Sequence, residues 1–212
     1  MSLRDDKKRQ QRREILEEAI ALFRERGYDE TRIQDVIDRV RISEATFFNY
    51  FPTKDALLEE YALSRIEAYA HLLRVEVEDR TRSVAERMRD LLRIIATGLE
   101  QEEREFMAVV ATRSRLFFGG KGGMFERKVL AQGLLARLFE EGQANGEIRT
   151  DTDPELLAES LAGAYTFTMV NWLTCRWEDS GPLRPRLQQV ADVFLEGCRA
   201  TTKAAVAARR RA

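Results

Sequence analysis

The chain has 212 residues, of which 44% are hydrophobic and 33% charged, so it is neither disordered nor fibrous and should fold as one large domain or two small ones. Its 35 Lys and Arg side chains balance 36 Asp and Glu, which gives a formal net charge of -1 and excludes a polycationic binder. The single histidine, His71, excludes zinc sites and di-iron bundles that need two histidines. We therefore expect neither a metal nor a cofactor.

The sequence predicts no membrane span. The longest stretch without a charged residue, 160–175, is shorter than the roughly 18 residues that a spanning helix needs. The N-terminus lacks the apolar core of a secretory signal, and two cysteines far apart in the chain indicate reduced thiols. We expect a cytoplasmic protein.

The four prolines favour an all-α fold, because each lies where an apolar helical pattern begins or ends. The first helix is expected over 8–26, with Gly27 as its C-cap. One face of this helix is apolar, as a helix that packs on a core requires. The residues of that face are Ile15, Leu16, Ala19, Ile20, Leu22 and Phe23.

Two short helices are expected next. Thr31 and Gln34 have the spacing of a capping box at the start of the first. Ser43 is placed to cap the second, with Phe47 packing on Ile42 across that cap. Two short helices joined by a tight turn and packed on a longer one form the smallest scaffold that places a helix in the major groove of DNA.

Six further helices bring the predicted total to about nine. Pro52 and Thr53 precede a long fourth helix, and Ser83 with Glu86 forms a capping box for the fifth. Pro154 begins a helix that should run to about residue 177. No strand alternation interrupts the pattern, so the predicted fold class is all-α.

A local site for an anion is expected at Lys54. This residue occupies the first turn of the fourth helix, where the positive end of the helix dipole disfavours a cation. A bound phosphate would remove the conflict, because the ammonium, the free helix amides and the Thr53 hydroxyl would converge on it. Arg32 repeats this pattern at the second helix. Residues 1–13, with six basic and two acidic residues, fit either an arm along the DNA backbone or a solvated tail.

The run ISEATFFNYFPTKDALL over 42–58, preceded by TRIQDVIDRVR over 31–41, closely resembles the helix-turn-helix of TetR-type transcriptional regulators (TetR/AcrR type). The resemblance implies a DNA-binding domain over 1–52 and a helical domain for ligand binding and dimerisation over 53–205. Residues 206–212 are expected to form a disordered tail. It further implies a homodimeric regulator and not an enzyme, most simply a repressor released by a small, mostly apolar ligand.

The resemblance also assigns DNA contacts. Thr46, Tyr50 and Lys54 would bind phosphates, while base edges would be read by side chains that suit them chemically: Asn and Gln pair with adenine, Glu accepts from cytosine, and Ala touches a thymine methyl. The full expected set is Arg32, Gln34, Ser43, Glu44, Ala45, Thr46, Phe48, Asn49, Tyr50 and Lys54.

Two residues depart from the family pattern. Arg41 stands in the turn where the family often has Gly, so the turn must reach its backbone angles without one. Phe48 replaces the usual Tyr, which removes a phosphate-bonding hydroxyl and leaves a ring that could contact thymine methyls.

Beyond residue 58 the expected sites rest on helical periodicity. An Arg on an apolar face suggests an acidic group on the effector, and the predicted cavity residues are Met88, Leu92, Phe106, Val110, Arg113, Phe117, Tyr165, Met169 and Trp172. Residues 160–175 are apolar nearly all round, so this helix and the last one should pack on a partner chain. The predicted dimer interface is Leu187, Val190, Ala191, Phe194 and Cys198.

The expected partners are therefore double-stranded DNA with a near-palindromic operator, a small-molecule effector and a second copy of the chain. Two alternatives remain open on the residues alone. One is an all-helical enzyme or binding protein that takes a small molecule in the C-terminal cavity without regulating transcription. The other is a helical adaptor that has lost DNA binding.

Overall fold

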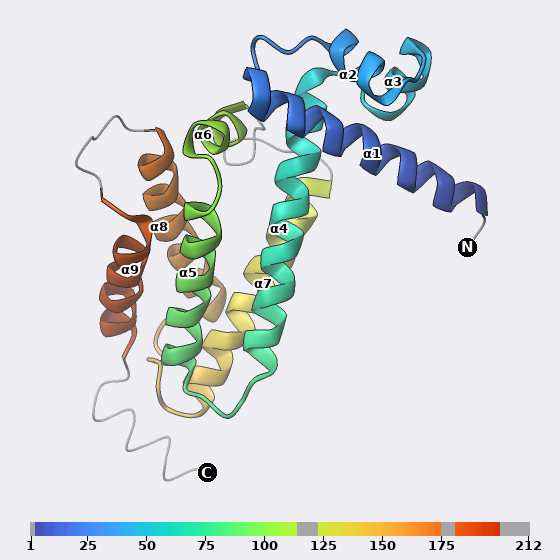
Figure 1. The fold of residues 1–212 in the computed structure, drawn as a ribbon. Helices are drawn as coiled ribbons and strands as arrows, with labels where there is room; N and C mark the ends of the chain where they lie inside the picture. The colour runs from blue at the N-terminus through green and yellow to red at the C-terminus, as the bar shows by residue number, and fades with distance from the viewer. Residues whose placement is uncertain (1–2, 114–122, 175–180, 200–212) are drawn as a thin grey trace. The chain divides into compact units, whose positions relative to one another are not determined.

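The computed structural model describes residues 3–113, 123–174 and 181–199 (Figure 1). Within these ranges the chain forms helices and no strands, which confirms the predicted all-α class. The helices are α1 (Leu3–Arg26), α2 (Ile33–Val40), α3 (Glu44–Tyr50), α4 (Lys54–Glu78), α5 (Val84–Glu100), α6 (Arg104–Arg113), α7 (Gly123–Ala144), α8 (Pro154–Thr174) and α9 (Leu183–Cys198).

The chain divides into two units by its internal contacts. The N-terminal unit contains the described residues up to Arg65 together with Glu105–Arg113. The C-terminal unit contains Ile66–Arg104 and the described residues from Gly123 onward. The first half of α4 and nearly all of α6 therefore belong with the predicted helix-turn-helix, while the second half of α4 belongs with the bundle.

Most helix ends follow the local signals. Ser43 accepts a hydrogen bond from the Thr46 amide at 3.1 Å, and Ser83 accepts one from the Glu86 amide at 3.2 Å. Gly27 has φ of +88° after the last residue of α1, as expected of a C-cap. Helix α1 begins at Leu3, five residues before the expected start, so the basic segment is helical over its described part.

The predicted capping role of Thr31 is wrong. Arg32 is the N-cap residue of α2, and its amide donates to Asp35 Oδ2 at 2.7 Å. Thr31 is buried, and its hydroxyl donates backwards to the Gly27 carbonyl at 2.8 Å. The capping box therefore forms between Arg32 and Asp35 and not between Thr31 and Gln34, because a carboxylate is a stronger hydrogen-bond acceptor than an amide oxygen.

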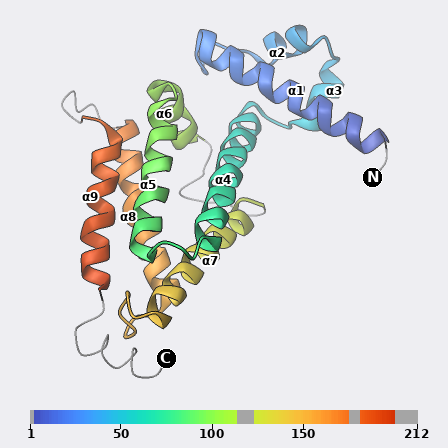
Figure 2. The ribbon, with the colours of Figure 1, turned by 60° about the horizontal axis from the view of Figure 1, so that its bottom comes forward.

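The C-terminal unit is built around α5. In both views α5 lies beside α9 (Figure 2), and α7 packs on α8. Polar contacts fasten α9 along its length: the Arg184 amide donates to Glu100 at 2.9 Å, and Arg89 pairs with Asp192 at 2.7 Å. At the far end the Arg149 amide donates to the Cys198 carbonyl at 2.8 Å.

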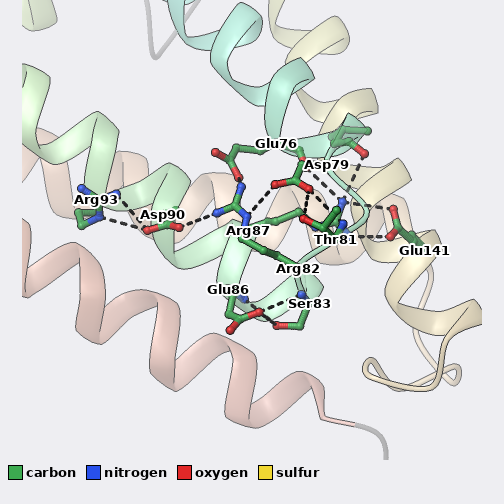
Figure 3. A network of polar contacts seen from close by, with 11 residues as sticks. Glu76, Asp79, Thr81, Arg82, Ser83, Glu86, Arg87, Asp90, Arg93 and Glu141 are labelled. Carbon is green, nitrogen blue, oxygen red and sulfur yellow. Dashed lines mark hydrogen bonds and ion pairs between the residues drawn. The ribbon is translucent and has the colours of Figure 1, made fainter.

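A polar network joins the end of α4, the start of α5 and α7 (Figure 3). Arg87 is completely buried and pairs with Glu141 at 2.6 Å, and it also donates to the Glu76 carbonyl at 3.1 Å. Arg82 pairs with Glu76 at 2.6 Å and with Asp90 at 2.7 Å. The bond from Arg87 to Glu76 satisfies a carbonyl group that the last turn of α4 leaves without a helical partner.

Candidate nucleic-acid interface

The turn between α2 and α3 is made without glycine. Arg41 adopts the left-handed conformation, with φ of 58° and ψ of 47°. The Ile42 amide donates to the Ile37 carbonyl at 3.2 Å, which is the long hydrogen bond of a Schellman turn. The non-glycine residue thus reaches the required angles, at the energetic cost that a side chain imposes there.

Helix α3 has one buried side and one exposed side. Phe47 is fully buried, as is Phe51 just beyond the helix. Four residues of the predicted DNA-contacting set face outwards on consecutive turns, because positions i, i+1, i+4 and i+5 share a helix face. These exposed residues are Glu44, Ala45, Phe48 and Asn49. Phe48 exposes 42% of its surface, so its ring is available for an apolar contact.

The residues around α3 are held by side-chain contacts. The Ser43 and Thr46 hydroxyls lie 2.8 Å apart, and the exposed Gln34 of α2 donates to Asp38 at 2.7 Å. The Tyr50 hydroxyl donates to Gln11 of α1 at 2.9 Å. Arg32 is exposed at the start of α2. The predicted DNA set is therefore brought together on α2, on α3 and at the start of α4.

Lys54 does not project freely. Its ammonium donates to the Tyr28 carbonyl and lies 4.0 Å from the centroid of the Tyr28 ring. Burial lowers the pKa of Lys54 from its ordinary value. The Thr53 hydroxyl accepts from the Ala56 amide at 3.1 Å and thereby caps α4. An ammonium has three donors, so Lys54 can bind a phosphate while it keeps its bond to Tyr28.

Arg12 is a residue near this surface that the sequence did not single out. It donates to the Tyr50 carbonyl at 2.7 Å, pairs with Glu60 at 3.2 Å and stacks 4.4 Å from the Phe51 ring centroid. It thus fastens the end of α3 to α1 and α4. This role of Arg12 could not be predicted, because Arg12 is one of several basic residues in the segment 1–13.

The predicted effector residues occupy several environments. Met88 and Leu92 are buried on α5, and Phe106 and Val110 are buried on α6. On α8, Tyr165 and Met169 are half-buried, and Trp172 is buried. Phe117 lies outside the described residues. Phe106 and Val110 belong to the N-terminal unit, whereas the predicted residues on α5 and α8 belong to the C-terminal unit.

The reason for predicting that Arg113 binds an acidic effector, a charge without a partner on an apolar face, does not hold. Its side chain is 48% exposed and pairs with Asp29 at 2.9 Å, so its charge is already compensated within the protein. The partner is thus not a neighbour in the sequence, since Asp29 lies 84 positions away. Arg104 is the cation beside Trp172: it donates to the Trp172 carbonyl and lies 4.8 Å from the centroid of its ring.

The predicted dimer residues lie on two sides of α9. Leu187, Ala191 and Cys198 are buried in the core of their own unit, so they cannot contact a partner, and this part of the prediction needs correction. Val190 and Phe194 are half-buried and line an open groove of about 530 Å³ between α8 and α9. Val193, which the sequence analysis did not select, is 73% exposed beside them, and Phe167 of α8 is 67% exposed.

None of the described helices combines the length and apolar character needed to cross a membrane. No cluster of three or more His, Cys, Asp or Glu side chains suited to a metal ion occurs among the described residues.

Comparisons with known proteins agree with the helix-turn-helix geometry. Residues 15–61 match the family model described as bacterial regulatory proteins, tetR family. The repressor KstR2 of Mycobacterium tuberculosis is 25% identical over 187 residues, which cover 87% of this chain and 88% of KstR2. The regulator TcmR of Streptomyces glaucescens is 30% identical over 105 residues, covering 49% of this chain and 45% of TcmR.

Solved structures share the fold. FadR of Thermus thermophilus, solved with lauroyl-CoA, matches with a TM-score of 0.69 at 24% identity and covers 88% of this chain and 94% of its own. FadR of Bacillus subtilis, solved with stearoyl-CoA, matches with a TM-score of 0.69 at 16% identity, and the match covers 87% of this chain and 97% of FadR. The match over residues 15–61, from within α1 into α4, and the capped helix α3 identify this helix-turn-helix as that of the TetR family of bacterial regulatory proteins, a family of transcription regulators and not of enzymes.

Proposed function

We propose that the chain is a homodimeric repressor that binds a near-palindromic operator and is released by a small, mostly apolar effector. The observation that carries this proposal is the exposed face of α3, where Glu44, Ala45, Phe48 and Asn49 project from a helix that is capped at its start and buried behind. These side chains carry the acceptors, donors and apolar groups that read base edges in the major groove. A protein with this role acts in the cytoplasm, where bacterial DNA lies.

The homodimer is supported by the outward surface of α8 and α9. Phe167 and Val193 are largely exposed, and the groove beside them is lined by side chains of both helices. A second copy of the chain would cover these apolar groups through a two-fold contact, in which the same surface is used by both partners. Two-fold symmetry would also place two α3 helices on two half-sites of an operator.

The part of the effector that the protein recognises is proposed to be a long apolar chain, and an acyl-CoA is the first candidate that carries one. Two structural neighbours hold lauroyl-CoA and stearoyl-CoA. The C-terminal unit of this chain offers half-buried Tyr165 and Met169 and the buried Trp172, which suit an apolar ligand. Because Arg113 is already paired with Asp29, its charge gives no reason to expect an acidic group on the effector.

The proposal is tested with DNA first. A randomised duplex pool is selected on the full chain, and the recovered sequence is measured by fluorescence anisotropy against a scrambled duplex of the same length. We expect a two-fold symmetric site and tighter binding to it than to the scrambled duplex, by about 10³-fold or more. Equal binding to both duplexes would contradict a sequence-specific regulator.

The effector is tested on the same complex. Lauroyl-CoA, stearoyl-CoA and free CoA are added separately to the chain bound to its selected site. Release by the acyl-CoAs and not by CoA supports an effector that is recognised through its apolar chain. Release by none of them would overturn the acyl-CoA class while leaving the DNA-binding proposal in place.

A further inference from the structure

Tyr28 is the centre of a compact polar cluster in the N-terminal unit. It is only 6% exposed, in the turn that follows α1. Its carbonyl accepts from the Lys54 ammonium, and its hydroxyl donates to Asp55. Lys54 and Arg113 both lie close to its ring, at 4.0 Å and 5.2 Å from the centroid. The start of α4 is therefore tied to this turn through two successive residues.

Arg113 holds the other side of the same turn. Its guanidinium pairs at 2.9 Å with Asp29, the residue directly after Tyr28. The pair therefore restrains the peptide whose carbonyl accepts from Lys54. It is exposed, with side-chain exposures of 48% and 73%, so its contribution to folding should be small.

Helix α6 is anchored in this unit at both of its ends. Near its start, the buried Phe106 ring lies 5.5 Å from that of Tyr61 on α4, and Arg24 of α1 lies 5.1 Å from the Phe106 ring centroid. At its end, Arg113 reaches the turn after α1. A shift of α6 would therefore displace the turn after α1, whose Tyr28 carbonyl binds the Lys54 ammonium.

We propose that Arg113 is a positioning residue for DNA binding: through Asp29 and Tyr28 it holds the Lys54 ammonium where a backbone phosphate can bind it. This inference rests on the proposed function, because it requires that Lys54 contact DNA. It gives α6 a part in operator affinity although no residue of α6 has to touch the DNA. Any event that draws Arg113 away from Asp29 would weaken the complex by leaving Lys54 less well placed.

Two substitutions separate positioning from a long-range effect of charge. Arg113→Gln removes a cation and Asp29→Asn removes an anion, so a long-range effect on the DNA polyanion would weaken binding in the first and strengthen it in the second. Loss of positioning weakens binding in both. We expect each variant to bind the selected duplex about three- to tenfold more weakly, as coupled contacts of this kind do when one partner is lost.

Lys54→Ala distinguishes the positioning role of Arg113 from a merely structural one. Alone it should lower the slope of log affinity against log salt by about one phosphate per subunit. Combined with Lys54→Ala, Arg113→Gln should have no further effect on affinity, because the residue that it positions is gone. Arg93→Gln, which removes an exposed ion-paired arginine from the C-terminal unit, is the matched control and should bind as the wild type does.

The possible outcomes separate the two proposals. If the wild-type chain shows no preference for any duplex, the proposed function fails. If the wild type binds its site and Asp29→Asn binds it as tightly or more tightly, the positioning role is overturned and the proposed function stands. Additive losses for Arg113→Gln and Lys54→Ala would also overturn it. Urea unfolding of each variant, expected to show nearly the same midpoint as the wild type, checks that the fold is intact.

Discussion

The guanidinium of Arg87 and the carboxylate of Glu141 meet at 2.6 Å and join α5 to α7, with Arg87 wholly removed from solvent. The same guanidinium donates to the Glu76 carbonyl at the end of α4 (Figure 3), so a single side chain links three helices of the C-terminal unit. A buried charge of this kind is costly unless its partner is present.

We expect Glu141→Ala to destabilise the chain by about 3 to 5 kcal/mol, because it leaves the Arg87 charge buried without its carboxylate. The double variant Arg87→Met with Glu141→Leu should cost less than Glu141→Ala, since it leaves neither charge of this pair without its partner. Urea unfolding measures both, with exposed Arg93→Ala as the control, expected to cost about 1 kcal/mol or less. A double variant less stable than Glu141→Ala would contradict this reasoning.

Arg41→Gly should stabilise the fold by about 0.5 to 1 kcal/mol. Arg41 adopts φ of 58°, where glycine pays no steric cost, and this gain exceeds the greater entropy of glycine in the unfolded chain. The midpoint of urea unfolding should rise. Gly27→Ala, at φ of +88°, is the reverse change and should lower it. An unchanged or lower midpoint for Arg41→Gly would show that the Arg41 side chain stabilises the turn.

Acid should weaken the fold in a defined pH range. Hydrogen bonds from Thr81 and Arg82 lower the pKa of Asp79 from 3.8 to about 2. Between these values the unfolded chain binds more protons than the folded one, so stability is complete above about pH 4 and falls as the pH drops toward 2. Asp79→Asn should flatten this part of the pH profile, measured by thermal unfolding. Equal slopes for the variant and the wild type would refute the assignment to Asp79.

Asn49→Ala and Lys54→Ala should weaken DNA binding in two different ways, one dependent on the base sequence and one independent of it. Loss of a base contact by Asn49 should relax preference at one base pair of each half-site, at a cost of about 1 to 3 kcal/mol. Loss of a phosphate contact by Lys54 should weaken binding to every duplex alike, because phosphates carry no sequence information. Binding to duplexes that vary one position at a time measures this difference. A uniform loss for Asn49→Ala would argue against base reading by that residue.

Val193→Asp should convert a dimer into monomers with an intact fold. Val193 is 73% exposed, so the charge is tolerated in the free protomer and becomes costly only when a partner covers it. Phe194→Asp is a less clean test, because Phe194 is half-buried and packs on Phe139 with ring centroids 5.8 Å apart. Sedimentation should find the wild type dimeric at micromolar concentration. A monomeric wild type would rule out the proposed dimer.

Local signals predicted helix ends well, since Ser43, Ser83 and Gly27 act on backbone groups within a few residues of themselves. They failed at Thr31, where two capping patterns overlap and the carboxylate of Asp35 is the better acceptor. The all-α class followed from periodicity, which is a property of the whole chain.

Long-range pairings could not be predicted. The Arg113 side chain finds its partner 84 positions away, and Arg87 lies among charged neighbours that read as a solvated helix face. The apolar stripe of α9 was visible, but helical period does not say which side faces the chain's own core. Leu187 and Ala191 turned out to be on that side.

Because α9 is held at its start, middle and end, the surface that we propose for the contact with a second subunit is already ordered in the single chain. The contacts of Arg184 with Glu100, of Arg89 with Asp192 and of Arg149 with Cys198 restrain the backbone in the free protomer. Association then loses little conformational entropy in this helix, and subunits can dock largely as rigid bodies. The heat-capacity change on dimerisation should accordingly reflect the apolar area covered, without the larger change that accompanies folding on binding.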